Sequence, residues 1–226
     1  MNFKIIKEDG YKDSIFGYHP NFLNEIQQQE LIKWLEQQNE FNNEERGENS
    51  ISRLQKWFQK DGEYFCNQWK QRFSRWESCV YDDILNNLQN KIQLYIDSLD
   101  ILNNNAINPV NLNSCLINKY RDGNDYIKPH RDTSLSFGDE PLIVGLSIGC
   151  PRKLMFKRVI DNINNKLSKR DKNKSYLDFS LTLDSGSLFI MMGSSQRFWS
   201  HEIPKSDDKK ERYSFTFREY ILPNPN

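Results

Sequence analysis

The sequence predicts an α+β fold that is mainly β: a double-stranded β-helix, or jelly roll, with N-terminal helices packed on it. From residue 113 onward, the period of the apolar residues changes to that of strands. Before that point, two segments repeat their apolar residues at helical spacing. Because no helical pattern interrupts the later strands, we expect them to form two packed antiparallel sheets.

The two helices are placed by their caps and apolar stripes. Asn24 followed by Gln27 resembles a capping box, and Asp82 or Asp83 opens the second helix. Residues 39–50 are polar and predict a loop. The stripes consist of Ile26, Leu31, Ile32 and Leu35 in the first helix, and Ile84, Leu85, Leu88, Ile92, Tyr95, Ile96 and Leu99 in the second. The N-terminal third is therefore expected to be mainly helical.

Six strands are predicted in the remainder of the chain. They cover residues 114–120, 142–149, 154–159, 176–183, 187–192 and 213–220. The chain has no internal repeat and no low-complexity linker, and a length of 226 residues suits one domain. We therefore expect a single domain over residues 1–226, in which a jelly-roll core at 113–222 rests on a helical part at 1–112.

Composition indicates the class of protein. No apolar run is long enough to predict a membrane span, and the N-terminus lacks the features of a secretory signal. The four cysteines are widely spaced without a Cys-x-x-Cys pair, which favours reduced thiols over a disulfide framework or a zinc ribbon. We expect a monomeric intracellular protein of the nucleus or cytoplasm, neither secreted nor bound to a membrane.

Charge is balanced overall but uneven along the chain. The 31 Lys and Arg equal the 31 Asp and Glu, which argues against a general polyanion binder. Residues 151–175 nevertheless hold nine Lys or Arg against two Asp, a local surplus of seven. This stretch can either contact phosphates or form a solvated loop. Residues 51–76 interleave seven aromatic residues with six Lys or Arg.

Two of the three histidines belong to a pattern that suits a metal ion. On a strand, His130 and Asp132 would point to the same face because they are two residues apart. His201, from a distant strand, would complete a two-histidine, one-carboxylate triad that leaves positions open on a non-haem iron. The zinc site of a hydrolase is an alternative for the same ligands. However, no His-Glu-x-x-His motif accompanies them.

Two arginines near the C-terminus suit a dicarboxylate. Arg212 and Arg218 lie six residues apart on a predicted strand and therefore share one face. Their guanidinium groups could hold the carboxylates of a co-substrate through charge-assisted, bidentate hydrogen bonds. This pairing favours iron and a 2-oxo acid over a zinc hydrolase.

Six elements of the sequence then occur in the order of a known family. They are Asn118-Lys119-Tyr120, Arg121 to Asp125, Tyr126 to Asp132, Gly186 to Gly193, Ser194 to Pro204 and Arg212 to Arg218. Together, over residues 113–220, they resemble the AlkB family of iron- and 2-oxoglutarate-dependent dioxygenases. A weaker likeness extends toward the N-terminus at Arg53-Leu54-Gln55-Lys56-Trp57 and Arg75-Trp76.

The resemblance implies roles for the matching residues. It implies that His130, Asp132 and His201 are the ligands of Fe(II). It also implies that Arg212 binds the distal carboxylate of the co-substrate 2-oxoglutarate, and that Asn118, Tyr120 and Arg218 make further contacts with this co-substrate. Trp76 would lie over the target base, in a part of 1–112 that acts as a substrate lid. Packing in the core remains an alternative interpretation of Tyr120, Trp76 and Trp199, and a strand-end or turn position remains one for Asn118 and Gln196.

The implied reaction is oxidative demethylation of a nucleobase in DNA or RNA, which consumes O2 and 2-oxoglutarate and releases formaldehyde, succinate and CO2. A base in a duplex must leave its stack to react. In several nucleic-acid repair members, the residue two positions after the metal aspartate is acidic and contacts the exocyclic amine of the lesion. Here that residue is Ser134. Ser134 could still hydrogen-bond a base, so the methylated base stays open.

Two further functions are compatible with the sequence. One is a 2-oxoglutarate oxygenase acting on a protein side chain or a small metabolite, which the balanced charge and Ser134 allow. The basic and aromatic segment at 53–75 argues against it. The other is a catalytically silent binding module that retains the fold, which is disfavoured because no member of the triad is substituted.

Overall fold

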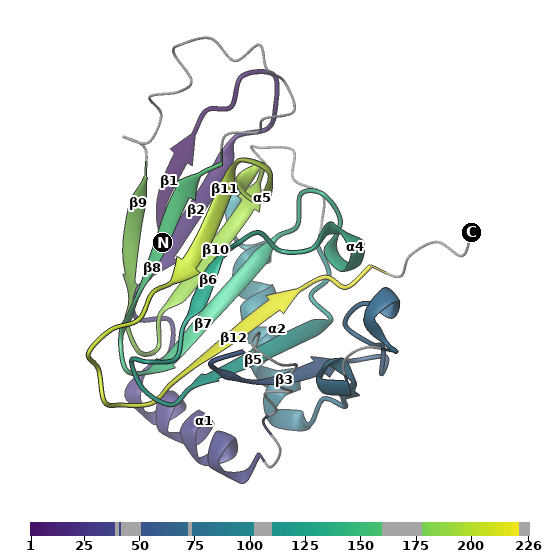
Figure 1. Ribbon diagram of the computed structural model, residues 1–226, viewed down its shortest axis with the longest axis vertical. Helices are drawn as coiled ribbons and strands as arrows, with labels where there is room; N and C mark the ends of the chain where they lie inside the picture. Colours follow the sequence, from purple (N-terminus) through teal and green to yellow (C-terminus); the bar gives the residue numbers. More distant parts are fainter. Residues whose placement is uncertain (39–40, 42–50, 72–73, 102–109, 160–177, 222–226) are drawn as a thin grey trace.

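Two β-sheets packed face to face form the centre of the fold (Figure 1). The computed structural model describes residues 1–38, 41, 51–71, 74–101, 110–159 and 178–221. The larger sheet has eight strands in the order β1-β2-β10-β7-β12-β5-β3-β4, and the smaller sheet has four in the order β6-β11-β8-β9. The expected class, mainly β with a jelly-roll core, is confirmed.

The elements have these bounds. The strands are β1 (Asn2–Ile6), β2 (Ser14–His19), β3 (Leu54–Gln59), β4 (Ser78–Cys79), β5 (Ser114–Tyr120), β6 (Ile127–His130), β7 (Ile143–Gly149), β8 (Arg152–Arg158), β9 (Phe179–Leu183), β10 (Leu188–Gly193), β11 (Trp199–Ile203) and β12 (Arg212–Arg218). The helices are α1 (Glu25–Gln37), α2 (Asp83–Asp97), α4 (Ser134–Phe137) and α5 (Ser195–Phe198), with short 3-10 turns η2 (Asn67–Trp69) and η3 (Ser74–Trp76). All six predicted strands are present with small shifts of their ends, although residues 176–177 lie outside the described part.

Alternation along the central strands divides the interior into two layers. In β12, Phe215 and Phe217 pack toward α1 and α2, in a core shared with β5, β7 and β10. Arg212 and Arg218, on the other face of the same strand, line a cavity between the sheets. Because β12 is antiparallel to β5, Arg212 lies opposite Tyr120 and both side chains reach this inner face. The expected shared face of the two arginines is confirmed.

Both long helices begin where their caps predict. The Asn24 side chain accepts a hydrogen bond from the backbone of Gln27 at 2.9 Å, and the Gln27 side chain accepts one from the backbone of Asn24 at 3.2 Å. Asp82 caps α2. The apolar stripes are narrower than expected, because Ile26 and Ile84 lie in the first turns and are 69% and 46% exposed.

The expectation of a mainly helical N-terminal third is wrong. Within residues 1–75, the strands β1, β2 and β3 hold more residues than α1 does, and β2 pairs with β10 and β3 with β5 in the larger sheet. Because β10 and β5 come from later in the chain, the pairing that stabilises β2 and β3 leaves little trace in local periodicity. The short strands β6 and β11, which carry His130 and His201, were likewise absent from the six predicted strands.

The cysteines are present as thiols, as their spacing in the sequence predicts. All four cysteines are free, and burial raises the pKa of the Cys115 thiol well above its usual range. Across the described residues, none of the helices has both the length and the apolar character needed to span a bilayer.

Candidate metal centre and cavity

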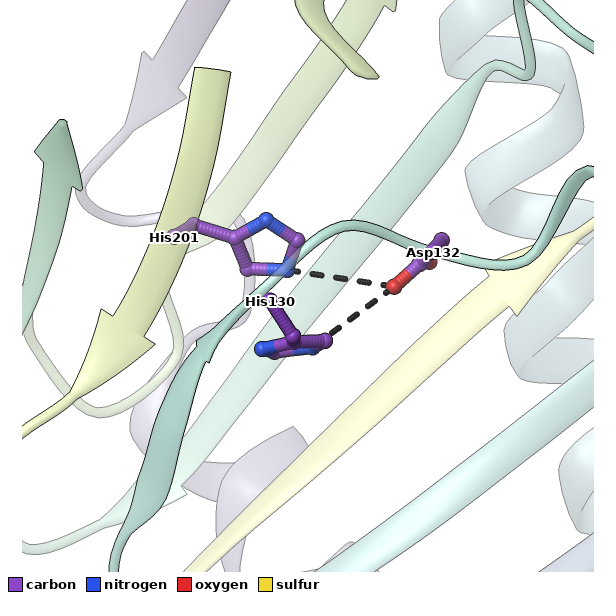
Figure 2. Close-up of side chains that lie close together, drawn as sticks. All are labelled: His130, Asp132 and His201. Atoms are coloured by element: carbon purple, nitrogen blue, oxygen red, sulfur yellow. Dashed lines mark ion pairs between the residues drawn. The ribbon is translucent and has the colours of Figure 1, made fainter. Parts of the chain in front are cut away.

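The three predicted metal ligands meet at one end of the smaller sheet (Figure 2). His130 ends β6 and is paired in register with His201 on β11, which brings the two ring centroids to 4.2 Å. Asp132 Oδ1 lies 3.7 Å from His130 Nε2 and 3.9 Å from His201 Nε2. The three ligand atoms all lie within 4.8 Å of one another, and two imidazoles with one carboxylate are a donor set that suits Fe(II).

Asp132 was expected on the same strand as His130, but the structure places it elsewhere. β6 ends at His130, so Asp132 lies on the loop that follows and not on a strand. Its orientation depends on two neighbours instead. The Asp132 backbone N–H donates to Gln196 Oε1 at 2.8 Å, and Arg218 donates to Asp132 Oδ2 through Nε and Nη2, each at 2.6 Å. Gln196 is therefore a positioning residue, and its buried amide holds the ligand loop against α5.

The protonation states suit metal binding. Burial lowers the pKa of His201 to about 3, so its imidazole is neutral at physiological pH. Burial also lowers the pKa of His130, whose Nδ1 lies 2.9 Å from the Lys128 carbonyl oxygen and donates to it, leaving Nε2 free as a ligand. For Asp132, burial opposes ionisation and is the largest single influence, but the charge and hydrogen bonds of Arg218 together with the two neighbouring imidazoles outweigh it and lower the pKa.

A cavity of about 260 Å³ extends from the triad across the inner face of the larger sheet. Arg212 lines it and is 2% exposed, with Nη2 donating to Ser147 Oγ at 2.9 Å and the guanidinium 4.9 Å from the centre of the Tyr120 ring. Its Nε and Nη1 have no hydrogen-bond partner among the described residues. Buried guanidinium groups are normally paired, so these two donors indicate a site for an anionic group.

The remaining residues assigned to the co-substrate also line this cavity. Asn118 and Tyr120 do so from β5, and Arg218 does so from β12 with its Nη1 still unpartnered among the described residues. Asn118 Oδ1 accepts hydrogen bonds from Arg53 Nε at 2.8 Å and from Gln55 Nε2 at 2.9 Å. Arg53 and Gln55 line the cavity as well, and no role was predicted for either of them.

Aromatic rings from the segment after β3 line another part of the cavity. Trp76 is buried and stacks on Phe65, with ring centroids 4.3 Å apart and an angle of 21° between the planes. Trp69 is stacked on Phe65 at 5.8 Å and lines the same cavity. The structure therefore brings Trp76 to the cavity, together with two rings that carried no predicted role.

Ser134 is not brought to the cavity. It is exposed at the start of α4, while the preceding Thr133 lines the cavity and caps this short helix by accepting from the Leu135 backbone at 3.3 Å. Trp199 follows the core interpretation, since it is 1% exposed and its indole N–H donates to Glu8 at 3.3 Å.

Most of the predicted basic stretch at 151–175 lies outside the described residues, because 160–177 are not described. Of its described members, Arg158 pairs with buried Glu8, Lys157 pairs with Glu202 at 2.7 Å, and Arg152 is buried against backbone carbonyls. These three side chains bond within the protein and give the phosphate-contact interpretation no support.

Comparisons with known proteins agree with this site. DNA oxidative demethylase ALKBH2 of Arabidopsis thaliana is 36% identical over 116 residues, which cover 47% of this chain and 37% of that protein. Alpha-ketoglutarate-dependent dioxygenase alkB homolog 3 of Homo sapiens is 35% identical over 115 residues, covering 50% and 38%. The matches thus span well under half the length of these relatives. They confirm the resemblance to AlkB enzymes.

The structure titled OsALKBH1 shares the fold, with a TM-score of 0.60 over 96% of this chain and 100% of that chain at 13% identity. The sequence model of a protein family, the 2OG-Fe(II) oxygenase superfamily, matches residues 16–218 of this chain. That span includes the triad and the cavity arginines, and membership implies Fe(II), 2-oxoglutarate and O2. It favours iron over the zinc of the alternative interpretation. The chain belongs to the 2OG-Fe(II) oxygenase superfamily.

Proposed function

We propose that this protein is an oxidative demethylase that removes N-methyl groups from nucleobases in DNA or RNA, and that residues 1–226 act as one dioxygenase domain. The observation that carries the proposal is the cavity, in which the triad, an anion site at Arg212 and stacked aromatic rings lie together. The name of the Arabidopsis relative, DNA oxidative demethylase, supports the same activity, and the name of the human relative supports a 2-oxoglutarate-dependent dioxygenase. The protein would then work in the nucleus or cytoplasm, where methylated nucleic acid is its partner.

The chain's residues divide the work between metal, co-substrate and base. His130, Asp132 and His201 would hold Fe(II), which with 2-oxoglutarate and O2 supplies the oxidation of the methyl group. The two unpartnered donors of Arg212 match a carboxylate, and the buried position excludes water from that contact. Arg218 orients Asp132 and keeps its carboxylate ionised.

Base recognition would use the aromatic rings. A flipped base has two flat faces, and stacking on an aromatic side chain offsets part of the loss of base stacking in the duplex. Trp76 is fixed for this contact because Phe65 supports one side of its indole. The Trp76 Nε1 is buried without a partner among the described residues, so it offers a hydrogen bond to a ligand.

Mass spectrometry of methylated oligonucleotides tests the proposal. Short DNA and RNA strands that carry single N-methylated bases are incubated with the protein, Fe(II), ascorbate and 2-oxoglutarate, and succinate is followed in parallel. We expect loss of one methyl group from at least one base, and no loss with Asp132→Ala. Succinate without methyl loss on any strand would refute the nucleic-acid substrate and favour a protein side chain or a small metabolite.

A further inference from the structure

We propose that Gln55 reads the methylated base, accepting a hydrogen bond from an exocyclic amino group beside the methylated ring nitrogen. The inference rests on the proposed function, because it assumes that an N-methylated nucleobase enters the cavity. Gln55 lies on β3, is 1% exposed and lines the cavity. Its Oε1 is buried and has no hydrogen-bond partner among the described residues. A buried acceptor without a partner is destabilising, so one that lines a ligand cavity points to a donor on the ligand.

The hydrogen-bond network establishes which end of the Gln55 amide is free. A guanidinium can only donate, so the Asn118 atom that lies 2.8 Å from Arg53 Nε must be the oxygen. Gln55 contacts that same oxygen at 2.9 Å, so the contacting atom of Gln55 must be its nitrogen. The free atom is then Oε1, an acceptor only. Arg53 thus determines the orientation of both amides.

An acceptor at this place discriminates between nucleobases. Adenine and cytosine carry an amino donor beside the ring nitrogen of their base-pairing edge, whereas thymine and uracil carry carbonyl oxygens on both sides of that nitrogen. An amino group would satisfy Gln55 Oε1, but a carbonyl oxygen would leave two acceptors facing each other. The geometry therefore favours N-methylated adenine or cytosine over N-methylated thymine or uracil.

Gln55 would supply a fully buried acceptor that the loop after Asp132 does not match. Ser134 is exposed outside the cavity lining, and the Thr133 hydroxyl already accepts one hydrogen bond in capping α4. Gln55 instead lies beside Asn118 in the β3–β5 register. Its strand precedes the segment whose tryptophans line the same cavity, so base edge and base face would be read from one stretch of chain.

A matched pair of substrates tests this role. Two oligonucleotides differ only in 3-methylcytosine or 3-methyluracil, which exchange an amino group for a carbonyl oxygen beside the same N-methyl group. For the wild type we expect kcat/KM to favour 3-methylcytosine by roughly tenfold or more, from one satisfied against one unsatisfied buried acceptor. Gln55→Met keeps the size of the side chain and should reduce that preference to about threefold or less. Gln55→Glu keeps an acceptor and should retain it.

Gln59→Met is the matched control. Gln59 lies on the same strand, is equally buried and also has an Oε1 without a partner among the described residues, but it does not line the cavity. It should retain the wild-type preference. Succinate formation without a nucleic-acid substrate should be the same in Gln59→Met as in the wild type, because Gln59 does not line the cavity.

The outcomes separate the inference from the proposed function. Loss of preference in Gln55→Met, with retention in Gln55→Glu and Gln59→Met, supports the role of Gln55. Equal rates of the wild type on both oligonucleotides overturn this role but leave the demethylase in place. Demethylation of no N-methylated base by the wild type overturns both. If Gln55→Met does not fold, the wild-type preference and its retention in Gln55→Glu decide the matter.

Discussion

Replacing Arg212 with methionine should abolish tight 2-oxoglutarate binding without destabilising the ligand-free protein. The guanidinium donates a hydrogen bond to Ser147 and contacts the Tyr120 side chain, and its Nε and Nη1 have no partner among the described residues. Removing the hydrogen bond to Ser147 lowers the free energy of unfolding by about 1 kcal/mol, and removing the cation–π contact with the Tyr120 ring lowers it by about 2 kcal/mol. Removing a buried charge without a carboxylate partner recovers several kcal/mol of desolvation. The free energy of unfolding should therefore stay unchanged or rise.

The expected loss of affinity follows from the two free donors. Each charge-assisted hydrogen bond to a carboxylate contributes about 1.5–3 kcal/mol. Together they contribute about 3–6 kcal/mol, which corresponds to a dissociation constant for 2-oxoglutarate raised about 10²-fold to 10⁴-fold. Isothermal titration under anaerobic conditions with Fe(II) measures the affinity, and urea denaturation of the metal-free protein measures stability.

Arg152→Met is the control, for which we expect a loss of stability and no change in the affinity for 2-oxoglutarate. Arg152 is equally buried, but its guanidinium donates to the backbone carbonyls of Asp122, Asp125 and Pro204 and does not line the cavity. Its loss should lower the free energy of unfolding by about 3 kcal/mol or more and leave the affinity for 2-oxoglutarate unchanged. If Arg212→Met instead loses stability while its affinity for 2-oxoglutarate persists, the reasoning from unpartnered donors is refuted.

Three further predictions concern residues around the cavity and the core. Gln196→Leu removes the acceptor that holds the Asp132 loop and should weaken Fe(II) binding about 10-fold to 100-fold in a metal titration. An unchanged affinity for Fe(II) would contradict the positioning role of Gln196. Trp76→Ala should raise the KM for the oligonucleotide about 5-fold to 100-fold through lost stacking, but should leave succinate formation in the absence of oligonucleotide intact. An unchanged KM would assign Trp76 to the core. Glu8→Ala leaves Arg158, whose side chain is 11% exposed, without its carboxylate and should lower the free energy of unfolding by about 3–5 kcal/mol in urea. A loss below about 1 kcal/mol would show that water solvates the pair.

The candidate metal ligands could be singled out from the sequence because histidine is scarce in this chain. The chain has three histidines, and two of them fall in a pattern of ligand spacing, so the sequence alone distinguishes His130, Asp132 and His201 as ligand candidates. The shared face of Arg212 and Arg218 followed from strand alternation alone. Both inferences needed only the chemistry of the side chains and the local period.

The supporting residues could not be predicted in this way. Gln196 contacts the backbone of Asp132, and Gln55 contacts Asn118, across 64 and 63 positions of sequence. These contacts depend on the register of β3 against β5 and on the loop after β6, which local patterns do not encode. The same reason explains Ser134, because the turn into α4 and not the spacing from Asp132 decides which side chain lines the cavity.

The most direct test of the central claim is the ratio of formaldehyde to succinate on one methylated oligonucleotide. An oxidative demethylase releases one formaldehyde for each succinate coupled to the reaction, so we predict a ratio close to one for the wild type and neither product with Asp132→Ala. Succinate that accumulates without formaldehyde on every methylated strand would contradict nucleobase demethylation. Absence of both products from an iron-loaded wild type would contradict the oxygenase itself.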